Sequence, residues 1–420
     1  MKIYIDQFSN KLKLVTVDVA DSNSISIVVF IKVGSRFEKK AFCGISHFVE
    51  HNFFKGTKDL PKSKDIAVAI ENLGGTSNAF TSYEYTGYYI KVPKENADRG
   101  VEILSDMIKN STFPEEEIEK ERGVVIEEIR MNEDIPMRKV ANVFMAQLFG
   151  DHPLGRDIAG NIETVSRFTR NDILEFTKKH YIGENIVVCI AGGINYENIK
   201  SRVSELFGDI KKGKGSVYKK FKKRDLSKNK YKFIKKAVEQ THIVIGGFGL
   251  PNEIEKRYAL QVGLAILGRG LGSKLFQKIR EELGLAYYIQ IDHSGLYETG
   301  EWDVSLGVDN KRVIEAIRAV FKELSDFKQG KFNKDDIDRA RNFILGNLIT
   351  QMEATDDLAI WHGLQELLLG YIDDVQKAKS KVKKVTKDDI LEVWNEILID
   401  NNYIITALTS NENINIKSFI

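Results

Sequence analysis

The first half of the chain opens with strand-like patterns and continues with helical ones. Polar and apolar residues alternate along Leu12–Val19, and Ser24–Val33 is an apolar run rich in β-branched residues, so both segments predict strands. Strand-like patterns return at 77–92 and at 186–192. Four helices are predicted, two before the pattern at 77–92 and two after it, at 44–54, 62–73, 94–109 and 114–133, the last of them opened by a proline.

The same order of elements returns in the second half. A strand-like run, His242–Gly249, precedes a helical segment at Tyr258–Leu267. Later segments predict strands at 287–291, 301–307 and 402–408, and helices at 312–327 and 334–348. We interpret the repeat as a divergent internal duplication. Since neither half alternates strand and helix strictly, we expect an α+β fold of two tandem homologous domains, each a mixed or antiparallel sheet packed with helices.

A basic stretch, 211–230, separates the two halves. It holds ten basic residues and one acidic residue, which is a pattern that also occurs in nucleic-acid-binding segments. It has few aromatic residues and the rest of the chain offsets its charge, so we interpret it as a solvated linker. We therefore predict an N-terminal domain at 1–212, a linker at 213–230 and a C-terminal domain at 231–420.

Composition narrows the class of protein. Lys and Arg number 62 and Asp and Glu 60, and this balance argues against a binder of nucleic acid or of anionic membranes. The hydrophobic share of 42% and the charged share of 29% are ordinary for globular proteins and exclude a mainly disordered chain. A length of 420 residues also favours two domains.

Cysteine content and apolar runs bear on location. Cys43 and Cys189 are too few for a disulfide framework or a cysteine-based zinc ribbon. The first residues alternate in polarity and lack the apolar core of a signal peptide. The longest apolar stretch, Ile186–Ile194, is well short of the ~18 residues that a membrane span needs. We expect a soluble, cytoplasmic protein.

Candidate chemistry is concentrated in the segment His47-Phe-Val-Glu-His51. On a helix, residues four apart share a face, so both imidazoles can point at one metal ion with Glu50 beside them. An unligated carboxylate next to a metal can take a proton from water, and H-x-x-E-H is the inverzincin motif. A surface helix with two histidines is the simpler explanation. Phe48 and Val49 argue against it, because they predict a helix buried on most sides.

A third metal ligand is expected from another element, since catalytic zinc has three protein ligands. In the helix after Pro114, spacings of three, four and three place Ile118, Glu121, Val125 and Glu128 on one stripe. Glutamate on an apolar stripe is rare unless it is paired or bound to a metal, although a partly exposed charged helix also fits. Spacing does not choose between Glu121 and Glu128. Cys43 shares a face with His47, but we expect it to be a buried free cysteine.

These residues resemble the pitrilysin, insulysin and mitochondrial processing peptidase family. The resemblance rests on His47-Phe-Val-Glu-His51, followed after 76 residues by Glu128 within Glu121-Arg-Gly-Val-Val-Ile-Glu-Glu128. It implies that His47, His51 and Glu128 bind one zinc ion per chain and that Glu50 is the general base. Glu121 matches an acid that supports the ligands. The chain looks like the short, two-domain members of the family.

Other segments extend the resemblance. Phe54-Lys-Gly-Thr57 follows the motif as in the family, and His152-Pro-Leu-Gly155 resembles a loop of structural role. The segment Asn78-Ala-Phe-Thr-Ser82 resembles the edge strand that holds the substrate backbone. The substrate-binding residues implied by this match are Asn78, Ala79, Phe80 and Thr81.

The second half lacks H-x-x-E-H. Its glycine-rich run Leu267–Leu275 invites comparison with a phosphate-binding loop, but it follows a helix and its lysine does not directly follow a glycine. The segment Arg280-Glu-Glu-Leu-Gly-Leu-Ala-Tyr287 resembles the family's second signature. The resemblance implies that Arg280 and Tyr287 stabilise the oxyanion of the reaction, for which both are suitable donors.

The resemblance implies a zinc-dependent endopeptidase. Peptides or unfolded polypeptide segments would bind as an added β-strand in an enclosed chamber. Some short relatives divide the zinc ligands and the Arg/Tyr pair between unlike subunits, whereas this chain has both, so we expect a homodimer rather than pairing with a related subunit. The alternatives are a non-catalytic assembly subunit, although no ligand is missing here, and a metal-dependent hydrolase of non-peptide substrates.

Overall fold

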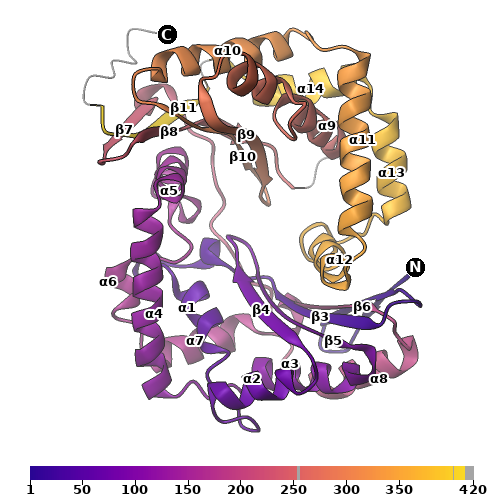
Figure 1. Cartoon of the computed structure of the whole chain (residues 1–420). Helices are drawn as coiled ribbons and strands as arrows, with labels where there is room; N and C mark the ends of the chain where they lie inside the picture. Colours follow the sequence, from indigo (N-terminus) through magenta and orange to yellow (C-terminus); the bar gives the residue numbers. More distant parts are fainter. Residues whose placement is uncertain (253–255, 401, 412–420) are drawn as a thin grey trace. The chain divides into compact units, whose positions relative to one another are not determined.

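A computed structural model describes residues 1–252, 256–400 and 402–411. In this part of the chain the strands form two mixed sheets, and helices pack on both (Figure 1). This architecture confirms the predicted α+β fold of two domains. Residues 412–420 of the predicted C-terminal domain lie outside the described part.

The first sheet is built from N-terminal strands. Its members are β1 (Lys2–Gln7), β2 (Lys13–Asp18), β3 (Ser24–Ile31), β4 (Thr76–Thr81), β5 (Thr86–Pro93) and β6 (Ile186–Gly192). They lie in the order β1-β2-β6-β3-β5-β4, so β4 is an edge strand. The β2–β6 pair is parallel and the other neighbours are antiparallel.

The second sheet repeats this topology. Its members are β7 (Tyr231–Lys235), β8 (Gln240–Gly249), β9 (Ala286–Gly295), β10 (Gly300–Asp309) and β11 (Ile404–Thr409). Their order β7-β11-β8-β10-β9 matches β2-β6-β3-β5-β4 strand for strand, and the β7–β11 pair is again parallel. The shared order supports the internal duplication that the sequence predicts.

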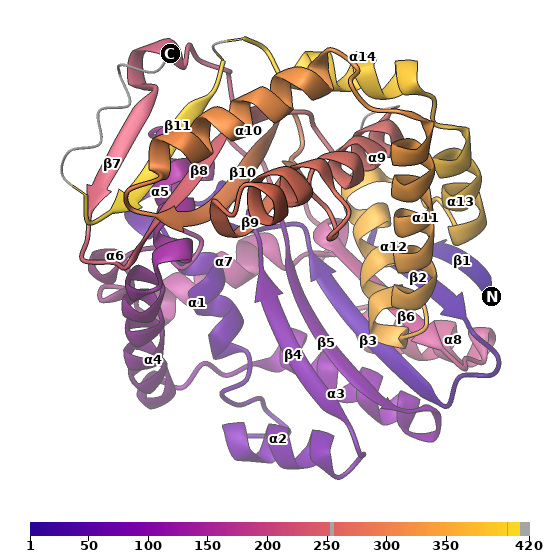
Figure 2. The ribbon, with the colours of Figure 1, turned by 45° about the horizontal axis from the view of Figure 1, so that its top comes forward.

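Two cores lie on the two faces of the first sheet, as the alternation of β3 requires. Ile25, Ile27 and Val29 belong to one core, with α1 (Ile45–Asn52), α3 (Ala97–Asn110), α4 (Glu115–Asp134), α7 (Arg170–His180) and α8 (Tyr196–Phe207). Val28 and Phe30 point to the other face, where α12 (Thr355–Leu369) packs on β3 and β6 (Figures 1 and 2). The N-terminal half of the chain also contains the helices α2 (Ser63–Glu71) and α6 (Ile162–Val165).

The second sheet has its own core. On one face, Ile243 and Ile245 of β8 pack with residues of the helices α9 (Arg257–Leu267), α10 (Val313–Lys328), α11 (Lys334–Gln351), α13 (Val375–Lys384) and α14 (Lys387–Ile397). On the other face, α5 (Pro136–Phe149) packs on β11 and β8 (Figure 2). A Cβ on Gly246 would lie 2.9 Å from the Phe144 ring, so glycine permits the close approach of α5.

The two compact units exchange segments of the chain. Unit 1 comprises 1–131, 156–219 and 351–372, and unit 2 comprises 132–155, 220–350 and 373–420. Helix α12, from the second half of the sequence, therefore belongs to the first unit, and α5 from the first half belongs to the second. Along the predicted linker, the change of unit falls between Lys219 and Lys220.

Several elements differ from the sequence-based expectation. The stretch 77–92 is a hairpin of β4 and β5, closed by a hydrogen bond of 2.8 Å from Ser82 N–H to the Tyr85 carbonyl. Its turn, Ser82-Tyr-Glu-Tyr85, contains no glycine, proline or asparagine, so the sequence has no clear break there. The sequence patterns do not predict strands β1 and β7 or helices α5, α6, α7, α8, α12, α13 and α14.

Candidate active site

Helix α1 carries both histidines of the H-x-x-E-H segment, and a remote carboxylate fixes its start. The N-cap residue is Gly44, whose φ of 93° favours glycine and which offers no side-chain cap. Glu38 supplies one, because its Oε2 accepts from Gly44 N–H and its Oε1 from Ser46 N–H, both at 2.8 Å. A carboxylate at this place satisfies free N–H groups and interacts favourably with the helix dipole.

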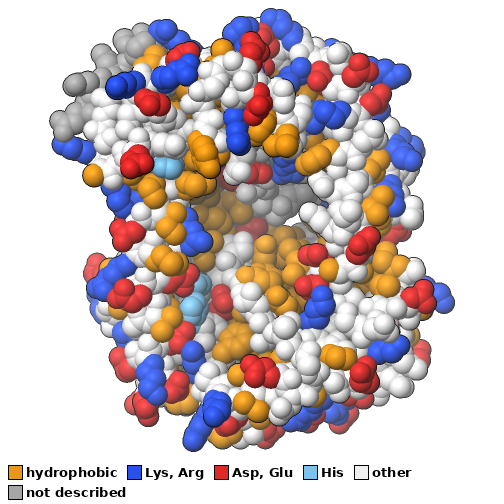
Figure 3. All heavy atoms as spheres, in the orientation of Figure 1, with side chains coloured by type: hydrophobic (Ala, Val, Ile, Leu, Met, Phe, Trp, Pro, Cys, Tyr) orange, Lys and Arg blue, Asp and Glu red, His pale blue; other side chains and the backbone are white. Residues whose placement is uncertain are grey.

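The faces of α1 divide between core and site. Phe48 and Val49 are completely buried in the core, and so is nearly all of Phe53, just after the helix. The side chains of His47 and His51 keep 12% and 20% of their surface exposed. Histidine atoms are visible at the surface where α1 lies (Figure 3). The two rings therefore lie on a helix that is anchored by its opposite side.

Helix α4 brings the two glutamates of the predicted stripe to α1. Ile118 and Val125 are buried in the same core as Phe48, which anchors α4 beside α1. Glu121 is also buried, and the Glu128 side chain is 31% exposed. The stripe thus runs from the core to the surface of the site.

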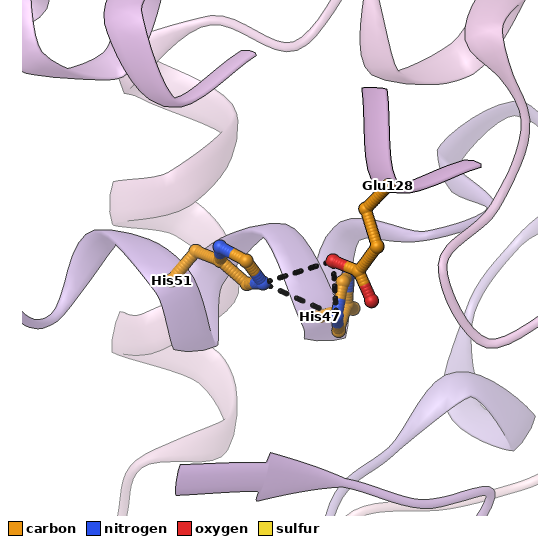
Figure 4. Close-up of side chains that lie close together, drawn as sticks. All are labelled: His47, His51 and Glu128. Carbon is orange, nitrogen blue, oxygen red and sulfur yellow. Dashed lines mark hydrogen bonds and ion pairs between the residues drawn. The ribbon is translucent and has the colours of Figure 1, made fainter. Parts of the chain in front are cut away.

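The rings of His47 and His51 and the carboxylate of Glu128 point toward one another (Figure 4). His51 Nε2 lies 3.3 Å from His47 Nε2. Glu128 Oε2 lies 3.6 Å from His47 Nε2 and 3.5 Å from His51 Nε2. Within the described ranges, these three residues form the group of His, Cys, Asp and Glu side chains that is compact enough to hold a metal ion.

This triangle fits a zinc ion. Ligand atoms about 2.0–2.1 Å from a tetrahedral zinc lie about 3.3–3.4 Å from one another, close to the three observed separations. Two imidazoles and a carboxylate are donors that zinc accepts, and three protein ligands leave a fourth position open. The residues that the structure brings together are therefore suited to a catalytic type of zinc site.

Glu121 lies behind His51 and fixes the state of its ring. Glu121 Oε1 is 2.7 Å from His51 Nδ1, and Glu121 Oε2 is 2.5 Å from Lys55 Nζ. Burial alone would raise the pKa of Glu121, but the hydrogen bonds with His51 and Lys55 outweigh it and lower that pKa. An ionised Glu121 accepts the Nδ1 proton, so Nε2 of the neutral ring presents its lone pair to a metal.

The metal-free histidines differ in basicity. Burial, and then the charge of His51, lowers the pKa of His47 to about 4. Burial would lower the pKa of His51 as well, but hydrogen bonds with Glu121 and Glu128 outweigh it and raise that pKa to about 9. Without a metal at neutral pH, His51 therefore holds an extra proton and His47 is neutral.

Glu50 lies on the same helix and outside the triangle of ligands. It is 8% exposed, and burial raises the pKa of its carboxyl. Thr81 Oγ1 donates a hydrogen bond of 2.5 Å to Glu50 Oε2. The carboxyl of Glu50, on the helix that carries both histidines, is thus held by strand β4.

The predicted substrate-binding residues Asn78–Thr81 all lie in β4. This strand pairs with β5 on one side, with Asn78 opposite Tyr89 and Thr81 opposite Thr86. Its other side is the edge of the sheet, where Ala79 N–H donates to Asn78 Oδ1 at 2.9 Å rather than to a neighbouring strand. The structure therefore places the segment at an open edge and connects its last residue to Glu50.

Arg280 and Tyr287 lie in unit 2. Arg280 is in a π-helix, Phe276–Glu282, and Tyr287 is in β9. Their side chains are close, with the guanidinium carbon 5.8 Å from the tyrosine ring centroid. Tyr287 is 73% exposed, so its hydroxyl faces solvent and is available as a hydrogen-bond donor. The structure brings these two predicted residues together.

Two roles near α1 escape analysis of the sequence. Glu38 as a helix cap and Lys55 as the partner of Glu121 depend on tertiary contacts, although Lys55 stands in the matched Phe54-Lys-Gly-Thr57 segment. Cys43 is outside the metal group, as expected. It is buried, its thiol donates weakly to the Asp157 carbonyl at 3.8 Å, and burial raises its pKa to about 12.

Comparisons with known proteins agree on one family. The sequence model of "Insulinase (Peptidase family M16)" matches residues 13–161, and that of "Peptidase M16 inactive domain" matches residues 167–344. A Rickettsia bellii protein named an uncharacterized zinc protease is 33% identical over 94% of this chain and 94% of its own. The chain therefore belongs to the insulinase family, peptidase family M16.

Solved structures show the same fold. The crystal structure of a protease from Helicobacter pylori superposes with a TM-score of 0.92 at 23% identity, covering 97% of this chain and 99% of that one. A peptidase M16 inactive domain from Pseudomonas fluorescens gives a TM-score of 0.90 at 15% identity, covering 97% and 98%. In the described part of this chain, no helix is long and apolar enough to cross a membrane.

Proposed function

We propose that this protein is a zinc-dependent endopeptidase that hydrolyses peptides or unfolded polypeptide segments. The observation that carries the proposal is the triangle of His47, His51 and Glu128, with separations of 3.3–3.6 Å, beside the buried Glu50. These three side chains would hold one zinc ion per chain. Membership of a family with relatives named zinc proteases supports the choice of metal.

Glu50 is the proposed general base. Bound at the triangle, zinc would supply Lewis acidity that polarises a peptide carbonyl and makes water more acidic. Glu50 would take the proton of the attacking water and return it to the leaving amine nitrogen. A carboxyl whose pKa is raised by burial is suited to hold that proton between the two transfers.

The open edge of β4 supports a peptide as substrate. An extended segment can add to an exposed strand through main-chain hydrogen bonds, with alternate side chains setting specificity. In this proposal Asn78, Ala79, Phe80 and Thr81 hold the substrate backbone. This edge ends at Thr81, which bonds to Glu50, and its position beside the proposed base favours a peptide over a small non-peptide substrate.

In this proposal Arg280 and Tyr287 stabilise the oxyanion of the reaction, which is the role that the family resemblance implies. A guanidinium and a phenol hydroxyl can both donate hydrogen bonds to an oxyanion. Their closeness on unit 2 supports a joint role. Because one chain has both this pair and the metal group, we propose a homodimer rather than two unlike subunits, and sedimentation of the active protein tests this: a fully active monomer would contradict it.

A non-catalytic assembly subunit is the competing function. One of the two matched sequence models describes an inactive domain. That model matches residues 167–344, whereas all three candidate ligands and Glu50 lie within residues 13–161, which the insulinase model matches. The complete donor set favours the enzyme.

Peptide hydrolysis tests the proposal. The wild-type protein and Glu50→Gln are incubated with a mixture of peptides, and zinc is quantified in both samples. We expect the wild type to bind one zinc ion and cut, and Glu50→Gln to keep its zinc and lose cleavage. If both bind zinc and neither cuts, the assembly subunit is favoured. If neither binds zinc, the ligand assignment is wrong.

A further inference from the structure

The hydroxyl of Thr81 bonds directly to the proposed base. Thr81 Oγ1 donates to Glu50 Oε2 at 2.5 Å and so connects strand β4 to helix α1. The other oxygen of this carboxylate, Oε1, has no hydrogen-bond partner among the described residues. One oxygen of Glu50 is thus held in place, and the other remains available for proton transfer.

The main chain of Thr81 faces the open edge of the sheet. Ser82 N–H bonds to the Tyr85 carbonyl at 2.8 Å, on the side of β4 that faces β5, whereas Ala79 N–H points away from β5 to Asn78 Oδ1. Residues two apart in an antiparallel strand present their N–H and C=O groups to the same side. Thr81 therefore faces the edge through its main chain, as Ala79 does, and reaches Glu50 through its side chain.

The turn after Thr81 is anchored, so Thr81 has a fixed position. Arg36 N–H donates to the Tyr83 carbonyl at 2.8 Å, and Ser35 N–H donates to the Ser82 carbonyl at 3.2 Å. The Arg36 guanidinium also forms an ion pair with Glu84 in the turn, and both side chains are almost completely buried. A buried ion pair is costly to break, which resists movement of the hairpin tip.

We propose that Thr81 is a positioning residue that couples binding of a peptide strand to the alignment of Glu50. This inference rests on the proposed function. A peptide that adds to β4 would bond to the main chain of the residue whose hydroxyl holds Glu50 Oε2. Binding would therefore steady the hydroxyl, and the hydroxyl would keep Oε1 turned to the reacting water. Small errors in the alignment of a catalytic group strongly lower the rate of the chemical step.

Two substitutions at one position separate this role from substrate binding. Thr81→Val removes the hydroxyl and keeps the β-branched shape, and Thr81→Ser keeps the hydroxyl. Thr76→Val is the matched control, because Thr76 is an exposed threonine of the same strand. Steady-state kinetics are measured on one peptide that the wild type cuts. Zinc content and thermal unfolding are measured on every variant to confirm that each is folded and loaded.

We expect kcat of Thr81→Val to fall about 10- to 100-fold while KM changes less than about threefold. Thr76→Val should stay within about threefold of the wild type in both constants, and Thr81→Ser should restore most of the kcat that Thr81→Val loses. A merely structural threonine would not give a selective loss of kcat that serine restores.

Three results would overturn the inference. They are an unchanged kcat in Thr81→Val, a rise in KM alone, or a serine variant as impaired as the valine variant. A wild-type protein that binds zinc and cuts no peptide contradicts the proposed function and, with it, this role of Thr81. A wild type that cuts while Thr81→Val is unimpaired contradicts the role of Thr81 alone.

Discussion

Glu121 Oε1 lies 2.7 Å from His51 Nδ1, on the side of the ring opposite the nitrogen that faces His47 and Glu128. The other oxygen of Glu121 is paired with Lys55. A carboxylate in this place fixes the orientation of the imidazole, sets its tautomer and makes it a better metal ligand. The contact therefore predicts an effect of Glu121 on metal affinity, although Glu121 is not itself one of the three candidate ligands.

Replacing Glu121 by glutamine should weaken zinc binding about 10- to 100-fold, because the ring loses its anionic acceptor while the site keeps its shape. Zinc affinity is measured by competition with a chelator of known strength. Glu116→Gln is the control, since Glu116 is on the same helix with 82% of its side chain exposed. Equal affinities of Glu121→Gln and the wild type would show that Glu121 does not support His51.

Zinc uptake should release a proton. In the metal-free group the pKa of His51 is about 9, because its hydrogen bonds to Glu121 and Glu128 outweigh burial, and burial lowers the pKa of His47 to about 4. At pH 7 His51 is therefore protonated and must lose that proton to bind a metal, whereas His47 is already neutral. We expect release of about one proton per zinc and an affinity that rises about tenfold per pH unit from pH 6 to 8.

Calorimetry in two buffers of different ionisation enthalpy measures this proton directly, since the apparent binding heat then differs between the buffers. The Glu121→Gln variant sharpens the test, because its His51 lacks one of the two carboxylates that raise the pKa. It should release a smaller fraction of a proton at pH 8. Equal heats in both buffers at pH 7 would contradict the predicted charge of His51.

The cap of α1 by Glu38 should contribute to stability. Glu38→Ala leaves the N–H groups of Gly44 and Ser46 without a buried acceptor, which should cost about 1–3 kcal/mol. Glu38→Gln keeps one acceptor oxygen and should cost less. Thermal unfolding of the metal-free proteins measures this, and the stability should fall from the wild type to Glu38→Gln and further to Glu38→Ala. A Glu38→Ala protein as stable as the wild type would mean that the start of α1 is held by its packing alone.

The sequence predicts part of the site, and helix geometry explains which part. His47, Glu50 and His51 are close in sequence, so a helix alone fixes which of them share a face. Spacing also puts Glu121 and Glu128 on one stripe, but it does not distinguish them. The family resemblance assigns Glu128 as the ligand, and the approach of α4 to α1 gives the physical reason, because it brings Glu128 to the Nε2 atoms and Glu121 to the far side of the His51 ring.

One of the elements that escape prediction, α12, has its packing partners far away in the sequence. Leu358, Ala359 and Leu367 of α12 pack against Val28 and Phe30, more than three hundred residues earlier. The apolar residues of α12 are spread around the helix, so periodicity gives no clear buried face. The bond from Thr81 to Glu50 escapes for the same reason, because it joins two elements through the fold.

The exchange of helices between the units predicts that the two fragments stay associated when the chain is cleaved in the linker. Helix α12 covers Val28 and Phe30 in unit 1, although it follows the linker in sequence. Helix α5 precedes the linker and packs in unit 2, where Thr406 Oγ1 donates to Gln147 Oε1 at 2.6 Å. Each sheet therefore depends on a helix from the other side of the linker.

A protease site inserted between Lys219 and Lys220 tests this dependence. After cleavage, fragments 1–219 and 220–420 should elute together in gel filtration and separate only in denaturant, because separation would expose the apolar faces under α12 and α5. Either fragment produced alone should be insoluble or unfolded, and mixing the two during refolding should restore the complex. Fragments that part in native buffer and stay folded would show that each half of the sequence forms its core without the exchanged helix.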